Sequence, residues 1–219
     1  MRLKIYGIAA SRASRPLWVA HELDLPYEHI ALPYLGGATR TPEFLSINPN
    51  GHIPVVDDDG VIVWESMACA LYLAGRFTGE GGLSLGALNH TEQADILRWT
   101  FWAVTECEKD ALTLLMHKDL MPEARRKPQL ALEAERRLRP ALRVLDDHLG
   151  ARPFLAGDRF TVADVCVASV LAWAQRSEDL MSAHARVREW LQRCLARPAR
   201  QHVLDMAARD LAADRPSQA

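Results

Sequence analysis

The segment Asn48-Pro49-Asn50-Gly51-His52-Ile53-Pro54-Val55-Val56 carries backbone groups that could bind an extended peptide. Pro54 opens an apolar run that is typical of a β-strand, where proline is tolerated only at the first residue or at an edge. An X-Pro bond can also adopt the cis form at modest cost, which predicts a special turn here. The N–H and C=O groups of Ile53 are therefore expected to be free, and a peptide could pair with them by strand addition.

The pair Glu65-Ser66 comes directly before a helix-forming run, Met67 to Ala74. Ser66 is a typical N-cap residue, so we expect it to cap this helix. The first N–H groups of a helix have no partner within the helix and attract anions. The pair therefore predicts a binding site for an anionic group at the start of the helix.

Two hydroxyl groups stand between the predicted first strand and first helix, on Ser11 and Ser14. Both could approach the N-terminus of that helix and stabilise a negative charge there. Alternatively, one serine caps the helix and the other is inert. Arg12 and Arg15 could add positive potential, but we expect them to be solvated, as most surface arginines are.

The ordered set of motifs resembles the glutathione-binding half of the cytosolic glutathione transferases, where Asn-Pro-x-Gly-x-(Val/Ile)-Pro, a hairpin and Glu/Gln-Ser follow one another. The resemblance implies that Ile53, held by Pro54, pairs with the cysteinyl part of glutathione. It also implies that Glu65 takes the γ-glutamyl amino group and Ser66 the γ-glutamyl carboxylate, while His52 falls near the glycyl end. A purely structural hairpin followed by an ordinary helix cap is the alternative interpretation.

The residues from Leu3 to Pro16 are similar to the start of the serine-type, theta-like transferases, whose catalytic serine falls on Ser11. Ser14 occupies a position where some relatives carry cysteine, and we favour Ser11 as the catalytic donor and Ser14 as the helix cap. A free thiol has a pKa of about 8.5, so the protein must favour the nucleophilic thiolate by a hydrogen bond or a helix N-terminus.

The resemblance implies conjugation, in which the thiolate attacks an electrophilic carbon of a second substrate. That substrate would lie against the helical second half of the chain. Trp102 is our candidate for substrate binding, although core packing is a common role for such a residue. At helical spacing, Trp99 and Trp102 share a face, and Phe101 points elsewhere.

The pattern of elements divides the chain into an α/β part and an all-α part. Strand, helix, strand, helix, two strands and a helix are predicted in this order over residues 3–74, which favours a small mixed sheet covered by helices. The resemblance identifies this part as a thioredoxin-like domain. We assign residues 1–78 to the glutathione-binding domain, the glycine-rich residues 79–88 to a linker, and residues 89–219 to an all-helical domain with the electrophile site.

Within the helical part, Asn89 and Glu92 form a capping-box pattern that opens a long predicted helix, residues 89–117. Pro140 lies inside another helical pattern and is expected to bend or split it. Thr161 and Asp164 form a second capping box. The same Thr-x-Ala-Asp segment is found in glutathione transferases as a core cap, so the resemblance extends over both halves, residues 3–200.

Composition excludes several classes of function. The chain has 219 residues, 49% of them hydrophobic, and a formal net charge of −2, which indicates no general nucleic-acid surface. No apolar run approaches the length of a membrane span. The 4 cysteines and the 8 histidines show no metal-ligand spacing, and Asp57-Asp58-Asp59 is expected in a solvated turn. Reduced, buried thiols and the absence of a signal-peptide pattern favour a cytoplasmic protein.

Three functions are compatible with these patterns. The leading hypothesis is a glutathione transferase acting on small electrophiles, and the resemblance also implies a homodimer. The second hypothesis keeps the fold and glutathione but changes the chemistry to isomerisation, dehalogenation or peroxidase activity. The third is a non-catalytic binding module of the same fold, because fold alone does not determine function.

Overall fold

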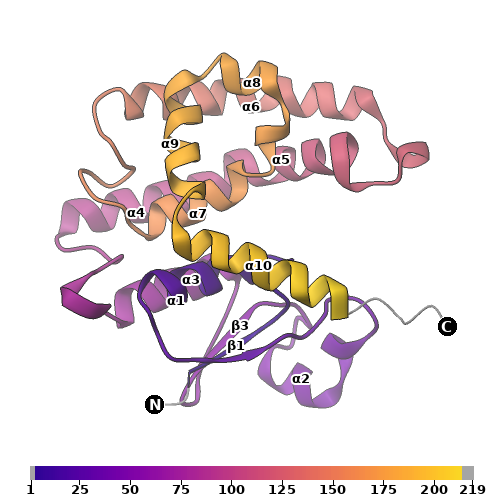
Figure 1. The fold of residues 1–219 in the computed structure, drawn as a ribbon, viewed down its shortest axis with the longest axis vertical. Helices are drawn as coiled ribbons and strands as arrows, with labels where there is room; N and C mark the ends of the chain where they lie inside the picture. Colours follow the sequence, from indigo (N-terminus) through magenta and orange to yellow (C-terminus); the bar gives the residue numbers. More distant parts are fainter. Residues whose placement is uncertain (1–2, 214–219) are drawn as a thin grey trace. The chain divides into compact units, whose positions relative to one another are not determined.

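The computed structural model describes residues 3–213, which fall into two compact units (Figure 1). One unit contains the chain up to Gly86 together with the segment that starts at Arg197. The other unit contains Ala87–Ala196. The predicted fold class, an α/β part followed by an all-α part, is confirmed.

The first unit is built on a four-stranded mixed sheet with the strand order β2-β1-β3-β4. The central strand β1 runs parallel to β2 and antiparallel to β3, and β3 continues into β4 through a tight hairpin. Alternate side chains of β1 are fully buried, as expected for a strand that is covered by helices on one face. The strands are β1 (Leu3–Tyr6), β2 (Glu28–Ile30), β3 (Val55–Asp58) and β4 (Val61–Trp64).

Within residues 3–213, four α-helices complete this unit, and α1 packs against two of the others, α3 and α10 (Figure 1). The short second helix begins with Thr41 as N-cap and Pro42 as the first helical residue. The helices are α1 (Ser14–Glu22), α2 (Pro42–Ile47), α3 (Ser66–Arg76) and α10 (Pro198–Ala213), with two 3-10 turns, η1 (Ala38–Arg40) and η2 (Glu80–Gly82).

The placement of α10 differs from the predicted domain boundaries, which put all of residues 89–219 in the helical domain. Val203 and Met206 of α10 are buried. The helix lies beside α1, and Arg197 forms two hydrogen bonds of 2.7 Å with the carboxylate of Glu22. Such long-range packing is not visible in the local pattern of the sequence, because the apolar face of a helix does not reveal its partner.

The second unit consists of helices, among which α5 packs against α6 and α7 against α4. The predicted capping box is confirmed, with the Asp164 carboxylate accepting from the Thr161 N–H at 2.9 Å. The helices are α4 (His90–Trp102), α5 (Glu108–Leu115), α6 (Pro128–Leu149), α7 (Val162–Leu171), α8 (Glu178–Ser182) and α9 (Ala185–Leu195), with the π-helical segments η3 (Ala103–Cys107) and η4 (Met116–Leu120) and the 3-10 turns η5 (Glu123–Arg125) and η6 (Ala174–Arg176).

Two expectations about single residues need correction. Pro140 was expected to bend or split its helix, and it does not split it: α6 is one helix of 22 residues, with buried Leu138 and Leu142 on either side of Pro140. Asp58 is not a solvated turn residue. It is buried, accepts a hydrogen bond of 2.8 Å from the Tyr72 hydroxyl, and lies 3.6 Å from the Arg76 guanidinium. Over residues 3–213, no helix is both long and apolar enough to cross a membrane.

Candidate functional site

Gly7, directly after β1, brings two of the predicted site segments together. A Cβ atom added to Gly7 would lie 3.0 Å from the Cβ atoms of both Ala13 and Ile53. The turn that carries Ser11 and the loop that carries Ile53 therefore approach each other closely across this residue. Gly7 also has a φ of +122°, a conformation that side-chain-bearing residues rarely adopt.

Ser11 lies in the turn that precedes α1, where its hydroxyl already has two partners. It donates a hydrogen bond of 2.7 Å to the carbonyl of Ile8 and accepts one of 3.1 Å from the N–H of Ala13. The hydroxyl thus stabilises the turn next to the start of α1. To donate to another group, the hydroxyl would exchange the Ile8 carbonyl for that group, which is favourable when the new acceptor is charged.

The expectation that Ser14 caps α1 was wrong. The N-cap residue is Ala13, and Ser14 is the first residue of the helix. Ser11 closes the turn instead, because its hydroxyl oxygen accepts a hydrogen bond from the N–H of Ala13. The half-buried hydroxyl of Ser14 has no hydrogen-bond partner within residues 3–213.

The loop before β3 presents Ile53 as the sequence predicts. The Ile53-Pro54 peptide bond is cis, and Pro54 is buried. The ladder between β1 and β3 starts only at Val55, and the N–H and C=O of Ile53 have no partner in the described chain. The side chain of His52 is exposed, and its carbonyl accepts a hydrogen bond of 2.7 Å from Asn48 Nδ2.

Glu65 and Ser66 lie at the start of α3, but their local roles differ from the expectation. Glu65, not Ser66, is the N-cap residue, and its backbone adopts φ 72° and ψ 120°. A non-glycine residue with such a φ is strained, and strain of this kind is concentrated at functional sites. The side chain of Glu65 is exposed, whereas Ser66 is buried.

Arg15 is a further residue of this site that the sequence prediction assigned to solvent. Only 1% of its surface is exposed, and its guanidinium donates a hydrogen bond of 2.7 Å to Ser66 Oγ. This contact joins the N-terminal ends of α1 and α3. The sequence contains a signal for this role. A cation in the first turn of a helix interacts unfavourably with the helix dipole, so the position of Arg15 there requires another explanation.

The cysteines of the protein are unsuited to act as nucleophiles. All four thiols are buried, as predicted, and none forms a disulfide within residues 3–213. Burial raises the pKa of the Cys69 thiol to about 12 and also raises the pKa of Cys107. A reactive thiolate at this site would therefore come from a ligand. In the part of the chain that the structure describes, no three His, Cys, Asp or Glu side chains gather as a metal site would require.

Trp102 lies at the C-terminal end of α4 in the helical unit, with its side chain partly exposed. Its ring meets the buried ring of Trp99 edge to face, with the centroids 5.0 Å apart. The expected shared face of these two residues is confirmed, and Phe101 is 62% exposed. Packing on Trp99 orients the Trp102 ring and leaves part of it open to a ligand.

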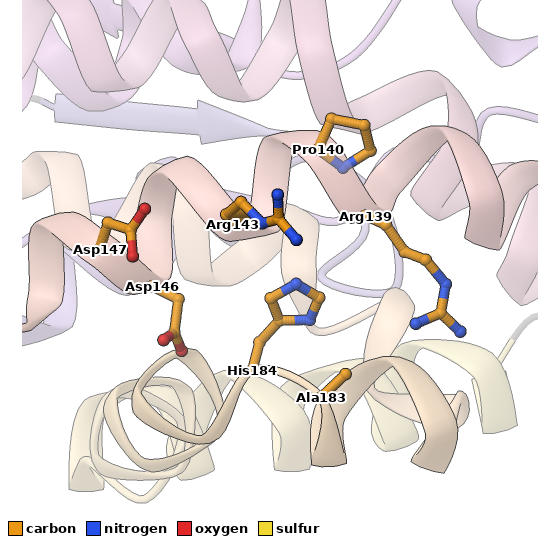
Figure 2. Close-up of a pocket in the computed structure, with 7 residues that line it drawn as sticks. All are labelled: Arg139, Pro140, Arg143, Asp146, Asp147, Ala183 and His184. Atoms are coloured by element: carbon orange, nitrogen blue, oxygen red, sulfur yellow. The ribbon is translucent and has the colours of Figure 1, made fainter.

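The helical unit also contains a hollow of about 520 Å³ next to α6, which is separate from the predicted residues. Figure 2 shows Arg139 and Arg143 projecting from α6 on the side of His184, with Asp146 and Asp147 further along the same helix. Basic and acidic groups line this hollow together. None of the predicted site residues lines it, although Pro140 does.

Two models of one protein family match the α/β part and the helical part of the chain. A model of the N-terminal domain of glutathione S-transferases matches residues 1–75, and a model of the C-terminal domain of the same proteins matches residues 122–193. The chain is 29% identical over 203 residues to glutathione S-transferase 3 of Zea mays, with 90% of each chain covered.

Solved structures of glutathione transferases have a fold similar to that of this chain. The theta class glutathione S-transferase of Xanthomonas axonopodis pv. citri, solved with glutathione bound, is 28% identical, with a TM-score of 0.79 and coverage of 91% of this chain and 95% of that chain. Glutathione transferase F7 of Populus trichocarpa has a TM-score of 0.83, with 94% of this chain and 99% of that chain covered; its identity is 24%.

Proposed function

Because the chain belongs to the glutathione S-transferase family, we propose that it activates the thiolate of glutathione for attack on a small electrophilic substrate. The observation that carries this proposal is the meeting of three segments in one unit. The Ser11 turn and the Ile53 loop meet at Gly7, and Arg15 joins the Ser11 turn to the start of α3.

The free backbone groups of Ile53 would pair with the cysteinyl residue of glutathione, in the manner of an added strand. The buried Pro54 fixes the direction in which they point. At the start of α3, Ser66 would receive the γ-glutamyl carboxylate, because its hydroxyl accepts from Arg15 and keeps its own proton for donation. The exposed carboxylate of Glu65 would bind the amino group, and His52 would lie near the glycyl end.

We propose Ser11 as the donor to the sulfur, and we also propose that the protein is a serine-type, theta-like member of the family. Its hydroxyl would turn from the Ile8 carbonyl to the thiolate, and a hydrogen bond to a charged acceptor is about twice as strong as one to a neutral acceptor. The N-terminus of α1 favours the same negative charge. The buried Arg15 adds a full positive charge close by.

The second substrate is proposed to bind the helical unit at Trp102. The ring is held by Trp99 and keeps an exposed part, which suits an apolar or aromatic electrophile. The proposed reaction joins the glutathione sulfur to an electrophilic carbon, with departure of the leaving group. The protein supplies thiolate stabilisation and proximity.

A homodimer is also proposed, because each unit exposes an apolar row. In the first unit, Ile62 and Trp64 of β4 lie two residues apart, on the same face of the strand, and are 39% and 41% exposed. In the helical unit, Leu97 and Phe101 are 38% and 62% exposed. Contiguous exposed apolar residues mark interaction surfaces. Sedimentation equilibrium should give twice the mass of one chain, and a purely monomeric protein would refute this part of the proposal.

We also propose that the protein works in the cytoplasm. Its four thiols are buried and form no disulfide within the described residues, which fits a reducing compartment. Fractionation of the source cells, with detection by an antibody, tests this assignment.

The direct test of the proposed function combines retention on immobilised glutathione with turnover of 1-chloro-2,4-dinitrobenzene. Retention with turnover is the expected result. Retention without turnover of this or any other electrophile would favour a non-catalytic binding module. Absence of both would refute the proposal.

A further inference from the structure

The C-terminal helix α10 contacts the turn that carries Ser11. Asp210, near the end of α10, accepts a hydrogen bond of 2.6 Å from the N–H of Ala9, although 201 residues separate them. Ala9 is 3% exposed, so water has little access to this part of the turn. Without Asp210, a buried N–H would lose its partner, and such groups are costly.

The turn depends on this contact because its other hydrogen bonds hold the residues before and after Ala9. The N–H groups of Gly7 and Ile8 bond to the carbonyls of Ile30 and Leu32, which continue the alignment of the sheet. Ser11 reaches back to the carbonyl of Ile8. Ala9 lies between these two sets of bonds, at the point where the chain leaves the sheet and bends toward α1.

The helix itself does not depend on Asp210 for its position. At its other end, Arg197 forms two hydrogen bonds of 2.7 Å with Glu22 of α1. The guanidinium of Arg200 lies 5.6 Å from the ring centre of Trp18, and the side chains of Val203 and Met206 are buried. Removal of the Asp210 carboxylate should therefore leave α10 in place and loosen only the turn.

We propose that Asp210 is a positioning residue for Ser11, acting through the Ala9 N–H. This inference rests on the proposed function, since it assigns a role within the same thiolate site. The groups proposed to bind glutathione, Ile53, Glu65 and Ser66, lie on other segments. Loss of Asp210 therefore acts mainly on the reactivity of bound glutathione and only slightly on its binding.

Three variants test this role. Asp210→Ala removes the acceptor, Asp210→Asn keeps an acceptor oxygen without the charge, and Asp205→Ala removes an exposed carboxylate from the same helix. Asp205 has no hydrogen-bond or ion-pair partner among residues 3–213. The measurements are kcat, the KM for glutathione, the pH profile of kcat/KM and the thermal midpoint.

For Asp210→Ala we expect kcat to fall about three- to tenfold, with less than about a twofold change in KM, because a slightly displaced donor loses alignment while binding persists. The pH profile should shift upward by about half a unit to one unit, as the thiolate is stabilised less. Asp210→Asn should recover most of the activity, and Asp205→Ala should match the wild type.

Unchanged kcat and pH profile in Asp210→Ala would overturn the inference, and so would an Asp210→Asn variant that is equally impaired. Hydrogen exchange of a peptide covering residues 7–13 gives a second readout, which should be faster in Asp210→Ala and unchanged in Asp205→Ala. Absence of glutathione turnover in the wild type would refute the proposed function instead, while the exchange measurement would still test the contact.

Discussion

The guanidinium of Arg15 donates a hydrogen bond of 2.7 Å to the hydroxyl of Ser66, across a separation of 51 residues. Both side chains are buried, with exposed fractions of 1% and 5%. The contact ties the start of α1 to the start of α3. It also orients the Ser66 hydroxyl as a donor, because the oxygen is already used as an acceptor.

Arg15→Met should raise the KM for glutathione about tenfold, because it removes a charged hydrogen-bond donor but keeps an unbranched apolar side chain. Initial-rate kinetics measure this effect. The thermal midpoint should fall as well, because the buried Ser66 hydroxyl loses a hydrogen-bond donor. Arg12→Met, at the exposed neighbouring arginine, is the control. An unchanged KM in Arg15→Met would contradict the assigned role.

Glu65→Gly should separate binding from stability. Glycine adopts the φ of 72° without strain, so the thermal midpoint should be unchanged or higher. The KM for glutathione should rise about tenfold through loss of a charge-assisted contact. Asp59→Gly is a matched control, because Asp59 is also exposed and has a φ of 54°. It should change stability without affecting KM.

Gly7→Ala should weaken catalysis by forcing the Ser11 turn and the Ile53 loop apart. The new Cβ would lie 3.0 Å from two neighbouring Cβ atoms, at a φ that alanine rarely adopts. We expect a loss of about 1–3 kcal/mol of stability and a lower kcat/KM. Gly75→Ala, in a helix with no atom within 4 Å of the new Cβ, should be neutral or stabilising. Equal effects of both substitutions would contradict this account.

The stability of the first unit should fall between neutral and mildly acidic pH because of His21. Burial lowers its pKa below the ordinary value of 6.5, and His202 and His29 lower it further, while Asp24 raises it. The unfolded chain therefore binds a proton at a higher pH than the folded one. The contribution of neutral His21 to the stability is fully present above the pKa of the unfolded state. It declines as the pH falls through 6.5 toward the pKa of the folded state.

Urea unfolding at several pH values between 8 and about 5.5 measures this decline. The His202→Gln variant should show a smaller decline, because the ring centres of His21 and His202 lie 4.2 Å apart. His90→Gln, at an exposed histidine of α4, is the control. Stability that rises on acidification from pH 7 to pH 6 would contradict the prediction.

Local patterns were sufficient to predict much of this architecture. The loop at Ile53 and the capping box between Thr161 and Asp164 involve residues at most a few positions apart. Their geometry follows from short-range sterics and hydrogen bonds. For this reason the mixed sheet, the helical second half and the free backbone of Ile53 could be predicted.

The errors have a different origin, because they depend on partners far away in the sequence. Arg15, expected to be solvated, is buried and bonds to Ser66 across 51 residues, and the contact between Asp210 and Ala9, which no expectation covered, spans 201 residues. α10 packs on the first unit, and α6 continues through Pro140 because its apolar face is buried on both sides. Secondary-structure propensity does not identify such tertiary partners, although they determine where these side chains and helices lie.

The central claim is that Ser11 stabilises the thiolate of bound glutathione. The most direct measurement is the ultraviolet absorbance of that thiolate, titrated with pH in the wild type, Ser11→Ala and Ser14→Ala. We predict that Ser11→Ala raises the pKa of the bound thiol by about one to two units, as expected for loss of one charge-assisted hydrogen bond, and that Ser14→Ala leaves it nearly unchanged. An unchanged pKa in Ser11→Ala together with a raised pKa in Ser14→Ala would contradict the account.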